Sequence, residues 1–558
     1  MAKLHSEFTL DLSQGMYDSV APTRYPNGSC ALLENGRIQA DGTVRRRYGS
    51  VRSSVTAITT EAVGYGGTMF QPVGKEAQIC VWYGSEFYVS EDWGFSWSLI
   101  ASNQREQYWS LASMRIGASS YLLAANGGDT IKRWDGTTYD DVPNAPSGVT
   151  SIATFNGRLY ATGHSGVFVA ASEIANIEVW AAPNGILLQV GTHDYEENTA
   201  MHQIGDHLLV FKRNSTSHID GYGEQTLIVA QDEQGFSRSV GCIAPRSIAT
   251  IGDVGLAWLS LRGVEYYTPQ TGINMVTRSV DEFMSQIDWE SAYNYPEQMV
   301  ATYDSKEQNY ILAMSTNGIQ NNRLLVLNIR ENVLDQRRGK IVAAGYDKLL
   351  SAAVNEYTFG ALDSYLKDDV AGEELLPDVD GYITLAGTGV AGWPVEDFDG
   401  YLVSALTNYM PTALFTAPAA GNPTAMWSLA HDGYCRIHWG VDKDDTRYTM
   451  TGGVEVYMTV ISKPKLMGKP RHRKKGRVIH VATLQESSAA VQVRLRGRGT
   501  TTAFKTLTMD ALGLDHASRK RAGVSLVADA PQVEIKTKDD VRLSLLGLSA
   551  EVLKEQVG

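Results

Sequence analysis

A unit of about 40–50 residues returns along the chain between residues 78 and 370, and this repeat constrains the fold more than any other feature. Each copy begins with a small turn, continues into an apolar strand, turns again and ends in an aromatic-rich strand. The copies cover residues 80–100, 114–139, 153–172, 202–220, 249–268 and 301–329. Four short antiparallel strands with tight turns need this length, which is the length of one propeller blade.

The turns and the apolar patterns of the copies agree on the same fold class. The turns before the second strands fall near Gly84, Ser119, Gly157, Gly205, Gly252 and Asp304, at separations of 35, 38, 48, 47 and 52 residues. Apolar residues alternate with polar ones or form short buried runs, and long helical periodicity is absent. We therefore predict an all-β protein built on a β-propeller of six to eight blades. A long array of β-sandwiches is the alternative, and a parallel α/β fold is disfavoured.

The sequence divides into three predicted parts. Residues 1–60 form an N-terminal arm with the leading strands, and residues 61–455 form the propeller. An irregular insertion at about 366–400 breaks the repeat with acidic and Gly-rich turns. Residues 456–558 form a C-terminal β-sandwich-like domain of alternating strands, in which only residues 511–521 and the last few residues look helical.

Charge is distributed unevenly between these parts. Residues 456–558 carry 19 Lys and Arg against 9 Asp and Glu, whereas residues 1–455 carry 30 against 53. The C-terminal domain is therefore basic although the whole chain has a net charge of −13. Such a split indicates two domains with different neighbours.

The cysteines and the N-terminus bear on the compartment in which the chain is made. Four cysteines lie far apart and form no CxxC pair: Cys30, Cys80, Cys242 and Cys435. This spacing argues against a disulfide framework or a zinc site and favours synthesis in a reducing cytosol. The first residues show no secretory signal, and no stretch approaches the roughly 18 apolar residues of a membrane helix.

One turn matches a known propeller pattern. Ser90, Asp92, Gly94 and Trp97 fit the Asp-box pattern S-x-D-x-G-x-[ST]-W. The hydroxyl and the carboxylate satisfy turn amides, the glycine permits a positive φ, and the tryptophan fills the blade core. The pattern resembles the turns of sialidases, where Asp boxes lie away from the active site. The Arg-Ile-Pro-type strand of that family is absent, so we predict a structural role for the turn.

Other motifs that resemble chemical sites are interpreted as ordinary turns. The run Gly387–Gly392 matches GxGxxG, but Trp393 and Pro394 follow it where a dinucleotide site needs a helix. Three acidic runs lack the bidentate Glu of a calcium loop: Asp378–Gly381, Asp397–Gly400 and Asp442–Asp445. A cluster without metal-ligand spacing is formed by His193, Asp194, Glu196, Glu197, His202 and His207. We predict no catalytic residue, no cofactor and no metal, and hence no enzyme.

A basic run lies at the start of the C-terminal domain. It contains Lys463, Lys465, Lys469, Arg471, Arg473, Lys474, Lys475 and Arg477. It can contact nucleic-acid phosphates, dock onto an acidic partner such as the propeller of a neighbouring subunit, or remain a solvated linker. Few aromatic residues interleave, so base stacking is not expected. The candidate docking residues are Lys469, Arg471, Arg473, Lys474, Lys475 and Arg477.

Both ends of the chain resemble one family. Near the N-terminus, a strand that contains Leu33, Asn35 and Arg37 leads to the turn Gly42-Thr-Val-Arg-Arg-Arg-Tyr-Gly49. Near the C-terminus, Gly468-Lys-Pro470 opens the basic run, and the last strand reads Arg542-Leu-Ser-Leu-Leu-Gly-Leu-Ser-Ala-Glu-Val552. These motifs resemble those of the nozzle (tail-tube, head-to-tail connector) proteins of short-tailed bacteriophages. The chain departs from that pattern at Tyr48, where the family has proline, and at 366–400.

The resemblance implies a structural virion protein. Nozzle proteins form a ring, usually sixfold, beneath the portal and adaptor proteins and pass the genome through a central channel during ejection. The implied partners are copies of the chain itself, the portal–adaptor proteins, tail fibre or spike and needle proteins, and DNA bound without sequence specificity. The protein would be made in the host cytoplasm and end in the virion tail. The alternatives are a receptor- or glycan-binding propeller of the tail and a sialidase-like glycan hydrolase.

Overall fold

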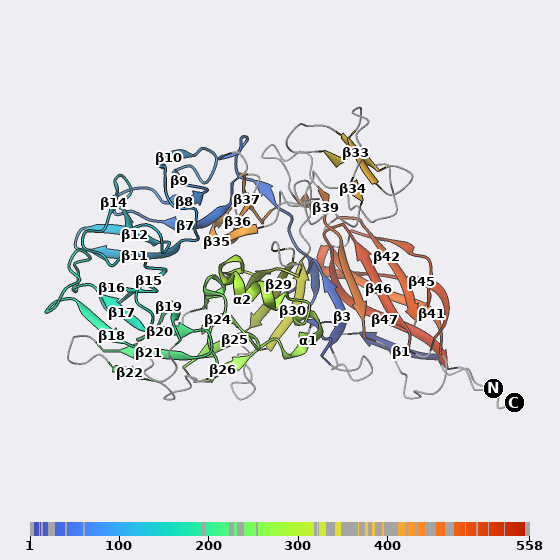
Figure 1. Cartoon of the computed structure of the whole chain (residues 1–558). Coiled ribbons are helices and arrows are strands. Elements are labelled where there is room, and N and C mark those ends of the chain that lie inside the picture. Colours follow the sequence, from blue (N-terminus) through green and yellow to red (C-terminus); the bar gives the residue numbers. More distant parts are fainter. Residues whose placement is uncertain are drawn as a thin grey trace.

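The computed structural model describes residues 5–10, 12, 15–19, 28–39, 42–59, 62–190, 196–221, 228–230, 239–252, 255–269, 271–316, 321, 323–330, 341–347, 366–367, 374–377, 382–385, 393–394, 411–419, 422–430, 433–440, 443–444, 454–463, 474–485, 487–497, 500–511, 513–528 and 530–552. Within these residues, seven groups of four antiparallel strands form the blades of a β-propeller. A β-sandwich stands beside the propeller, and both chain ends lie on its far side (Figure 1). The predicted fold class is confirmed.

The first four blades follow one another along the chain. Blade 1 contains β7 (Gly64–Phe70), β8 (Gln78–Tyr83), β9 (Glu86–Ser90) and β10 (Ser98–Ala101). Blade 2 contains β11 (Ser110–Ile116), β12 (Ser119–Ala125), β13 (Lys132–Trp134) and β14 (Tyr139–Asp141). Blade 3 contains β15 (Ser151–Phe155), β16 (Arg158–Thr162), β17 (Phe168–Ala171) and β18 (Ile186–Gln189). Blade 4 contains β19 (Asn198–Ile204), β20 (His207–Lys212), β21 (Thr216–Asp220) and β22 (Ile228–Ala230).

Three more blades complete the ring. Blade 5 contains β23 (Ala249–Ile251), β24 (Gly255–Ser260), β25 (Gly263–Thr268) and β26 (Gly272–Met275). Blade 6 contains β27 (Val300–Asp304), β28 (Asn309–Met314), β29 (Arg323–Arg330) and β30 (Ile341–Asp347). Blade 7 contains β35 (Pro411–Ala419), β36 (Asn422–Ala430), β37 (Cys435–Ile437) and β6 (Val51–Arg52).

Several short helices and two small sheets lie outside the blades in the described part of the chain. Five short helices are described: η2 (Pro245–Ser247), η3 (Arg278–Val280), α1 (Asp281–Met284), α2 (Trp289–Asn294) and η4 (Pro296–Gln298). Between blades 6 and 7, where the sequence predicts an insertion, lies a small sheet of β31 (Leu366–Lys367), β32 (Glu374–Pro377), β33 (Tyr382–Leu385) and β34 (Trp393–Pro394). A further pair joins β38 (Lys443–Asp444) to β39 (Val454–Glu455).

Hydrophobic side chains fill the seams between neighbouring blades. Alternate residues of a strand point to opposite faces, so each blade contributes one apolar set to each neighbour. Trp82 of blade 1 stacks on Trp109 at a ring-centroid distance of 5.4 Å, in the cluster shared with blade 2. Trp427 of blade 7 is fully buried against blade 1 in the same way. Burying these large aromatic side chains is the main source of stability for the ring.

Blade 7 is closed by a strand from the N-terminal side of blade 1. The two-residue strand β6 pairs with β37, placing Arg52 opposite Arg436. On the inner side, β7 approaches β35 closely because it contains glycines. A Cβ on Gly67 would lie 2.6 Å from the ring of Phe415, and a Cβ on Gly64 would lie 2.5 Å from Leu429. The Gly-rich start of β7 is therefore a requirement of ring closure.

The sandwich is built from both ends of the chain. One sheet contains β1 (His5–Leu10), β4 (Gly36–Ile38), β5 (Val44–Arg46), β41 (Lys474–Gln485), β45 (Gly513–Ala528) and β47 (Arg542–Val552). The other contains β2 (Gly15–Met16), β3 (Ser29–Glu34), β40 (Met458–Ser462), β42 (Ala489–Gly497), β43 (Thr500–Thr501), β44 (Lys505–Met509) and β46 (Gln532–Thr537). The N-terminal arm is thus part of the C-terminal domain.

The propeller and the sandwich share a sheet and a core. Strand β30 of blade 6 pairs in parallel with β2 and β3, so blade 6 and one sandwich sheet form a continuous 11-stranded sheet. One hydrophobic cluster includes Tyr266 of blade 5, Leu325 of blade 6 and Val481 of the sandwich. Because pairing and packing both cross the junction, the two parts form a single rigid unit.

Two local predictions were wrong. The helix predicted for residues 511–521 is absent from their described part, since β45 runs as a strand from Gly513 to Ala528 and pairs with β41. The turn at Gly84 is the second turn of blade 1, because β7 precedes β8, whereas the turns near the other five positions are first turns of their blades. The first repeat of the sequence is therefore offset by one strand.

All four cysteines are buried and none forms a disulfide. No described helix has the length and apolar character needed to cross a membrane.

Candidate functional site

The Asp-box turn connects β9 to β10 and is held by its own side chains. The hydroxyl of Ser90 donates to Oδ1 of Asp92 at 2.8 Å and accepts from the amide of Gly94 at 2.7 Å. The carboxylate of Asp92 also accepts from the amide of Ser96 at 2.9 Å and from its hydroxyl at 2.6 Å. Burial opposes ionisation of Asp92, but these hydrogen bonds outweigh it and lower its pKa.

The same turn packs against the closing blade. Gly94 has a φ of 85°, and a Cβ at this position would lie 3.0 Å from both Ser53 Cβ and Trp427 Cζ3. Ser53 follows the closing strand β6, and Trp427 lies on β36. Trp97 packs against the cluster that joins blades 7 and 1. The four Asp-box residues therefore lie where the ring is closed, and their contacts there are structural.

The basic run is only partly described. Lys469, Arg471 and Arg473 lie outside the described residues, whereas Lys474, Lys475 and Arg477 lie on β41. In the sheet, Lys475 is opposite Glu551 of β47, which is in turn opposite His5 of β1. The run therefore enters the sandwich at the end where both chain termini emerge, on the side away from the propeller (Figure 1).

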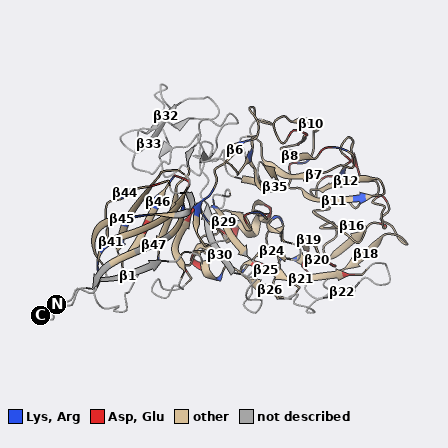
Figure 2. Cartoon of the chain, turned by 180° about the vertical axis from the view of Figure 1, so that it is seen from behind, with Lys and Arg blue, Asp and Glu red and all other residues tan. Residues whose placement is uncertain are grey.

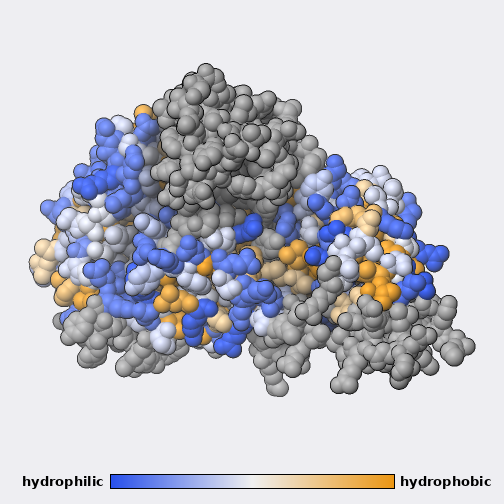
Figure 3. All heavy atoms as spheres, turned by 45° about the vertical axis from the view of Figure 1, so that its right-hand side comes forward, coloured by the Kyte–Doolittle hydropathy of each residue, from blue (hydrophilic) through white to orange (hydrophobic). Residues whose placement is uncertain are grey.

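On the face shown in Figure 3, hydrophilic residues predominate in the coloured part of the surface, with hydrophobic groups among them. Lys475 and Arg477 are half-buried, and Arg519 and Arg521 on the neighbouring strand β45 are exposed. A partner that docks on this end of the sandwich would be recognised through charge rather than through a large apolar patch.

A cavity of about 700 Å³ lies at the centre of the propeller. Residues on the first strands of six blades line it: β7, β11, β15, β19, β27 and β35. Figure 2 shows β7, β11 and β19 around the centre of the ring. Loops between the blades contribute Tyr108, Arg246 and Glu297 to its wall. The volume is in the range of small-ligand sites, and the wall combines apolar, hydroxyl and charged groups.

Arg246 on η2 is the best-positioned cation of the cavity. Its Nη1 donates to the carbonyl oxygens of Glu297 and Thr412, each at 3.0 Å. Its guanidinium also stacks over the ring of Tyr108, 4.0 Å from the centroid. Burial lowers the pKa of Arg246 to about 10, although Tyr108 and Glu297 act to raise it. The side chain is therefore cationic at neutral pH.

His202, on β19, also lines the cavity. Its Nε2 is 2.8 Å from the hydroxyl of Thr250 on β23, across the seam between blades 4 and 5. Burial lowers the pKa of His202 to about 4, so the imidazole is neutral at pH 7. The cavity therefore presents a fixed cation and a neutral ring at physiological pH.

The structure separates the histidine and carboxylate cluster of the sequence. His193 and Asp194 lie outside the described residues, and Glu196 accepts from the amide of Asn214 at 3.1 Å. His202 faces the cavity, whereas His207 lies on β20 beside Asp220. The glycine run 387–392 and the acidic run 397–400 also lie outside the described residues, as do 378–381, Asp442 and Asp445.

Sequence reasoning missed the cavity residues. Arg246 belongs to a three-residue 3-10 helix and Tyr108 to a connecting loop, and neither forms part of a motif. They meet only because the ring places the loops between successive blades around the central cavity. The expectation that such loops are disposed around the centre follows from the repeat, but it does not select these residues.

Comparison with known proteins gives no family. No family model matches the sequence, and no curated protein matches it. A chain from the crystal structure of the mitotic checkpoint complex is 12% identical, covering 47% of this chain and 76% of its own, with a TM-score of 0.30. Crystal structures of BBS1N in complex with ARL6DN, soaked with lead or mercury, are 10% identical. They cover 69% and 71% of this chain and 98% and 97% of their own, with TM-scores of 0.36 and 0.37.

Proposed function

We propose that this chain is a structural protein of a bacteriophage virion, which forms a ring in a short tail and extends the DNA channel below the portal and adaptor. In this proposal the protein acts as a nozzle or head-to-tail connector and has no catalytic role. Its partners are copies of itself, the portal–adaptor proteins and peripheral tail proteins, and DNA passes through the ring without being read.

One observation carries the proposal. The two motifs that resemble nozzle proteins lie about 500 residues apart in the sequence, yet they form neighbouring strands of one sheet. In that sheet β5 pairs with β47, placing Arg45 opposite Arg542 and Val44 opposite Leu543. Arg45 also binds Asp540 through two hydrogen bonds of 2.7 Å. Motifs that share a strand pairing belong to one structural element, which supports a resemblance of architecture rather than two chance matches.

The rigid junction suits a subunit that bears load. A tail ring must keep its channel open while DNA moves through it, so its subunit should not bend between domains. The continuous sheet and the shared core of blade 6 and the sandwich resist such bending. Interfaces between separate domains in one chain are usually smaller and more polar, and they allow relative motion.

The charge distribution supports the same proposal. The region before residue 456 carries 30 basic and 53 acidic residues, and an acidic wall repels phosphates and lets DNA slide. The basic end of the sandwich complements an acidic neighbour in the ring or above it. A cryo-electron reconstruction that shows a basic channel, or a basic run facing bulk solvent, would contradict these assignments.

The test is the assembly state of the purified protein. Light scattering and cryo-electron images would be collected with the protein alone and after addition of the portal–adaptor complex. A closed ring of about six copies with a pore wide enough for duplex DNA is expected. A protein that stays monomeric and ignores the portal–adaptor complex would overturn the proposal.

A second candidate, a receptor- or glycan-binding propeller, is favoured by the central cavity. Exposed aromatic rings suit the apolar faces of sugars, and Tyr293 and Tyr295 are 49% and 54% exposed. They precede Pro296 and Glu297, which line the cavity. Binding on a glycan array that is lost in a Tyr295→Ala variant, without turnover of fluorogenic glycosides, would favour this candidate.

A further inference from the structure

Three potential metal ligands meet in blade 4. His207 lies on β20, and His218 and Asp220 lie on β21. Nδ1 of His207 is 2.6 Å from Oδ1 of Asp220, and Nε2 of His218 is 2.9 Å from Oδ2 of the same carboxylate. The three ligand atoms all lie within 4.8 Å of one another.

The hairpin register explains why these residues meet. Leu208 is opposite Ile219, and Leu209 is opposite His218. His207 is therefore directly opposite Asp220 on the neighbouring strand. His218 lies two residues before Asp220, so both side chains point to the same face of the blade. Two imidazoles and one carboxylate are thus fixed on one face by backbone pairing.

The cluster is enclosed on one side and accessible on the other. The side chain of His218 is 3% exposed, whereas those of His207 and Asp220 are 19% and 30% exposed. Burial raises the pKa of Tyr267 in blade 5, and the nearby charge of Asp220 raises it further, so Tyr267 lies close to the cluster. The cluster therefore lies in the seam between blades 4 and 5, with two of its three side chains partly exposed to solvent.

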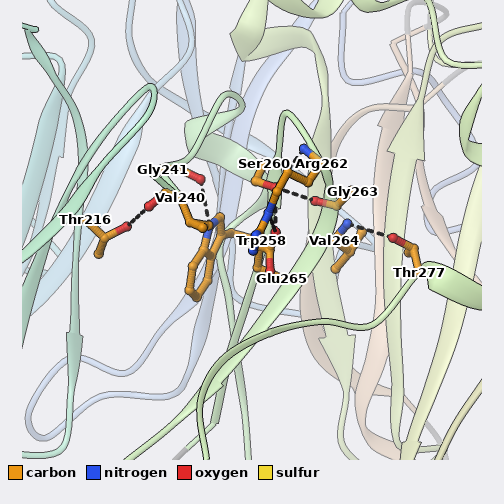
Figure 4. Close-up of polar contacts among 10 residues, drawn as sticks. All are labelled: Thr216, Val240, Gly241, Trp258, Ser260, Arg262, Gly263, Val264, Glu265 and Thr277. Atoms are coloured by element: carbon orange, nitrogen blue, oxygen red, sulfur yellow. Dashed lines mark hydrogen bonds and ion pairs between the residues drawn. The ribbon is translucent and has the colours of Figure 1, made fainter. Parts of the chain in front are cut away.

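The strand that carries two of the ligands is anchored at its other end. Figure 4 shows the hydroxyl of Thr216, the first residue of β21, donating to the carbonyl of Val240. It also shows the indole of Trp258 in blade 5 donating to the carbonyl of Gly241. These bonds are 2.7 and 2.9 Å long, and they tie β21 to blade 5 through residues 240–241. A ligand set on such a support needs little reorganisation to bind an ion.

We propose that His207, His218 and Asp220 bind one Zn²⁺ ion, with water as the fourth ligand. Two imidazole nitrogens and one carboxylate oxygen are ligands that zinc prefers, whereas Mg²⁺ and Ca²⁺ prefer oxygen. Tetrahedral zinc with bonds of about 2.0–2.2 Å separates its ligand atoms by about 3.3–3.5 Å. The observed N–O separations of 2.6 and 2.9 Å are shorter than that, so the side chains would rotate apart on binding.

Binding exchanges protons for the metal. Without metal, the carboxylate of Asp220 accepts a hydrogen bond from each ring, so the facing nitrogens carry protons. Coordination requires the lone pairs of those nitrogens, and each ring must then keep its proton on the other nitrogen or release it. Zinc binding should therefore strengthen as pH rises, and it should staple β20 to β21 at the edge of the seam. This proposal is independent of the tail function.

The experiment uses the full-length protein after removal of metals with a chelator. Zn²⁺ is titrated by calorimetry in two buffers of different ionisation enthalpy, and native mass spectrometry gives the stoichiometry. We expect one Zn²⁺ per chain, a higher midpoint of thermal unfolding, and no comparable effect of Mg²⁺. Bound Co²⁺ should show the intense visible absorption of a tetrahedral site.

The variants His207→Gln and Asp220→Asn should weaken zinc binding by about tenfold or more while keeping the far-UV circular dichroism of the native protein. His202→Gln, which changes a histidine of the adjacent strand outside the cluster, is the matched control and should bind Zn²⁺ like the wild type. Absence of Zn²⁺ binding to the wild-type chain, or equal binding by all three variants, would overturn the proposal and leave the cluster as a hydrogen-bonded triad.

Discussion

The side chains of Asn35 and Arg47 hydrogen-bond to each other where the sandwich meets blades 6 and 7. Nε of Arg47 donates to Oδ1 of Asn35 at 2.9 Å, and Nδ2 of Asn35 donates to the carbonyl of Tyr457 at 3.0 Å. Both side chains are almost fully buried, at 2% and 3% exposure. The strand that contains Asn35 is thus bound to the turn that contains Arg47, and Asn35 also binds the segment that leads into β40.

Replacing Asn35 by alanine should destabilise the sandwich by about 2–4 kcal/mol. The change leaves a buried guanidinium nitrogen and a carbonyl without this partner, and it forces alanine to adopt the φ of 53° found at Asn35. Asn103→Ala is the matched control, because Asn103 has a φ of 61° but is exposed. It should cost only about 1 kcal/mol.

Far-UV circular dichroism during urea unfolding measures this effect. All 11 tryptophans lie between Trp82 and Trp439, so their fluorescence reports directly on the propeller, whereas circular dichroism reports on the strands of both parts. Equal losses in the Asn35 and Asn103 variants would show that the buried network contributes nothing.

Replacing Gly94 by alanine should destabilise the closure of the ring. The new Cβ would meet Trp427 and Ser53 at 3.0 Å, in addition to the strain of a positive φ, for a total of about 2–4 kcal/mol. Gly74→Ala isolates the packing effect, because Gly74 has a φ of 75° with nothing within 4 Å of the added atom. Tryptophan fluorescence during urea unfolding should show the larger loss for the Gly94 variant, and matching midpoints would argue against tight packing at this turn.

Stability should fall as the pH drops from about 6.5 to about 4, in part through His202. The folded pKa of this ring is about 4, below its ordinary value of 6.5, so the unfolded chain binds one more proton between these values. Stability therefore rises with pH across this window and is fully present above it. In a His202→Gln variant, the free energy of unfolding should depend less steeply on pH, by the contribution of one proton. Urea midpoints measured from pH 4 to 7 test this. An unchanged slope would show that the imidazole is hydrated in the folded protein.

Reversing charge in the described part of the basic run should weaken association with the portal–adaptor complex. A double variant, Lys475→Glu with Arg477→Glu, changes the charge of the docking end by four units, and we expect about tenfold weaker binding at low salt. The control pairs Lys505→Glu with Lys538→Glu, two exposed positions elsewhere in the domain. Biolayer interferometry at several salt concentrations measures the effect. A similar loss in both double variants would indicate an effect of net charge alone.

Local patterns predicted most of the propeller but not its closure. Turns such as those near Gly157 and Gly205 are encoded by neighbouring residues, so six repeats are visible in the sequence. The seventh blade takes its outer strand from Val51–Arg52, and two residues carry no recognisable period. Strand β45 was missed because its central residues Ala517–Ala522 are small or charged and lack a clear apolar alternation.

The residues that could bind a metal or a ligand come together only in the folded protein. The sequence drew attention to His207 but paired it with residues before it, whereas the structure pairs it with His218 and Asp220. A hairpin register would have found the cluster, because it places position 207 opposite position 220. Arg246 and Tyr108 offer no such route, since they come from separate loops that meet only in the finished ring.

The origin of β6 sets the order in which the molecule can be completed during synthesis. A ribosome that has produced the first 400 residues has released six blades, while β6 still lacks its partner β37 and β1 still lacks β47. The N-terminal arm must wait, with unpaired strand edges, until almost the whole chain has emerged. Pairings over such sequence separations form slowly, so the nascent chain remains exposed to misassociation with its neighbours until the last strands arrive.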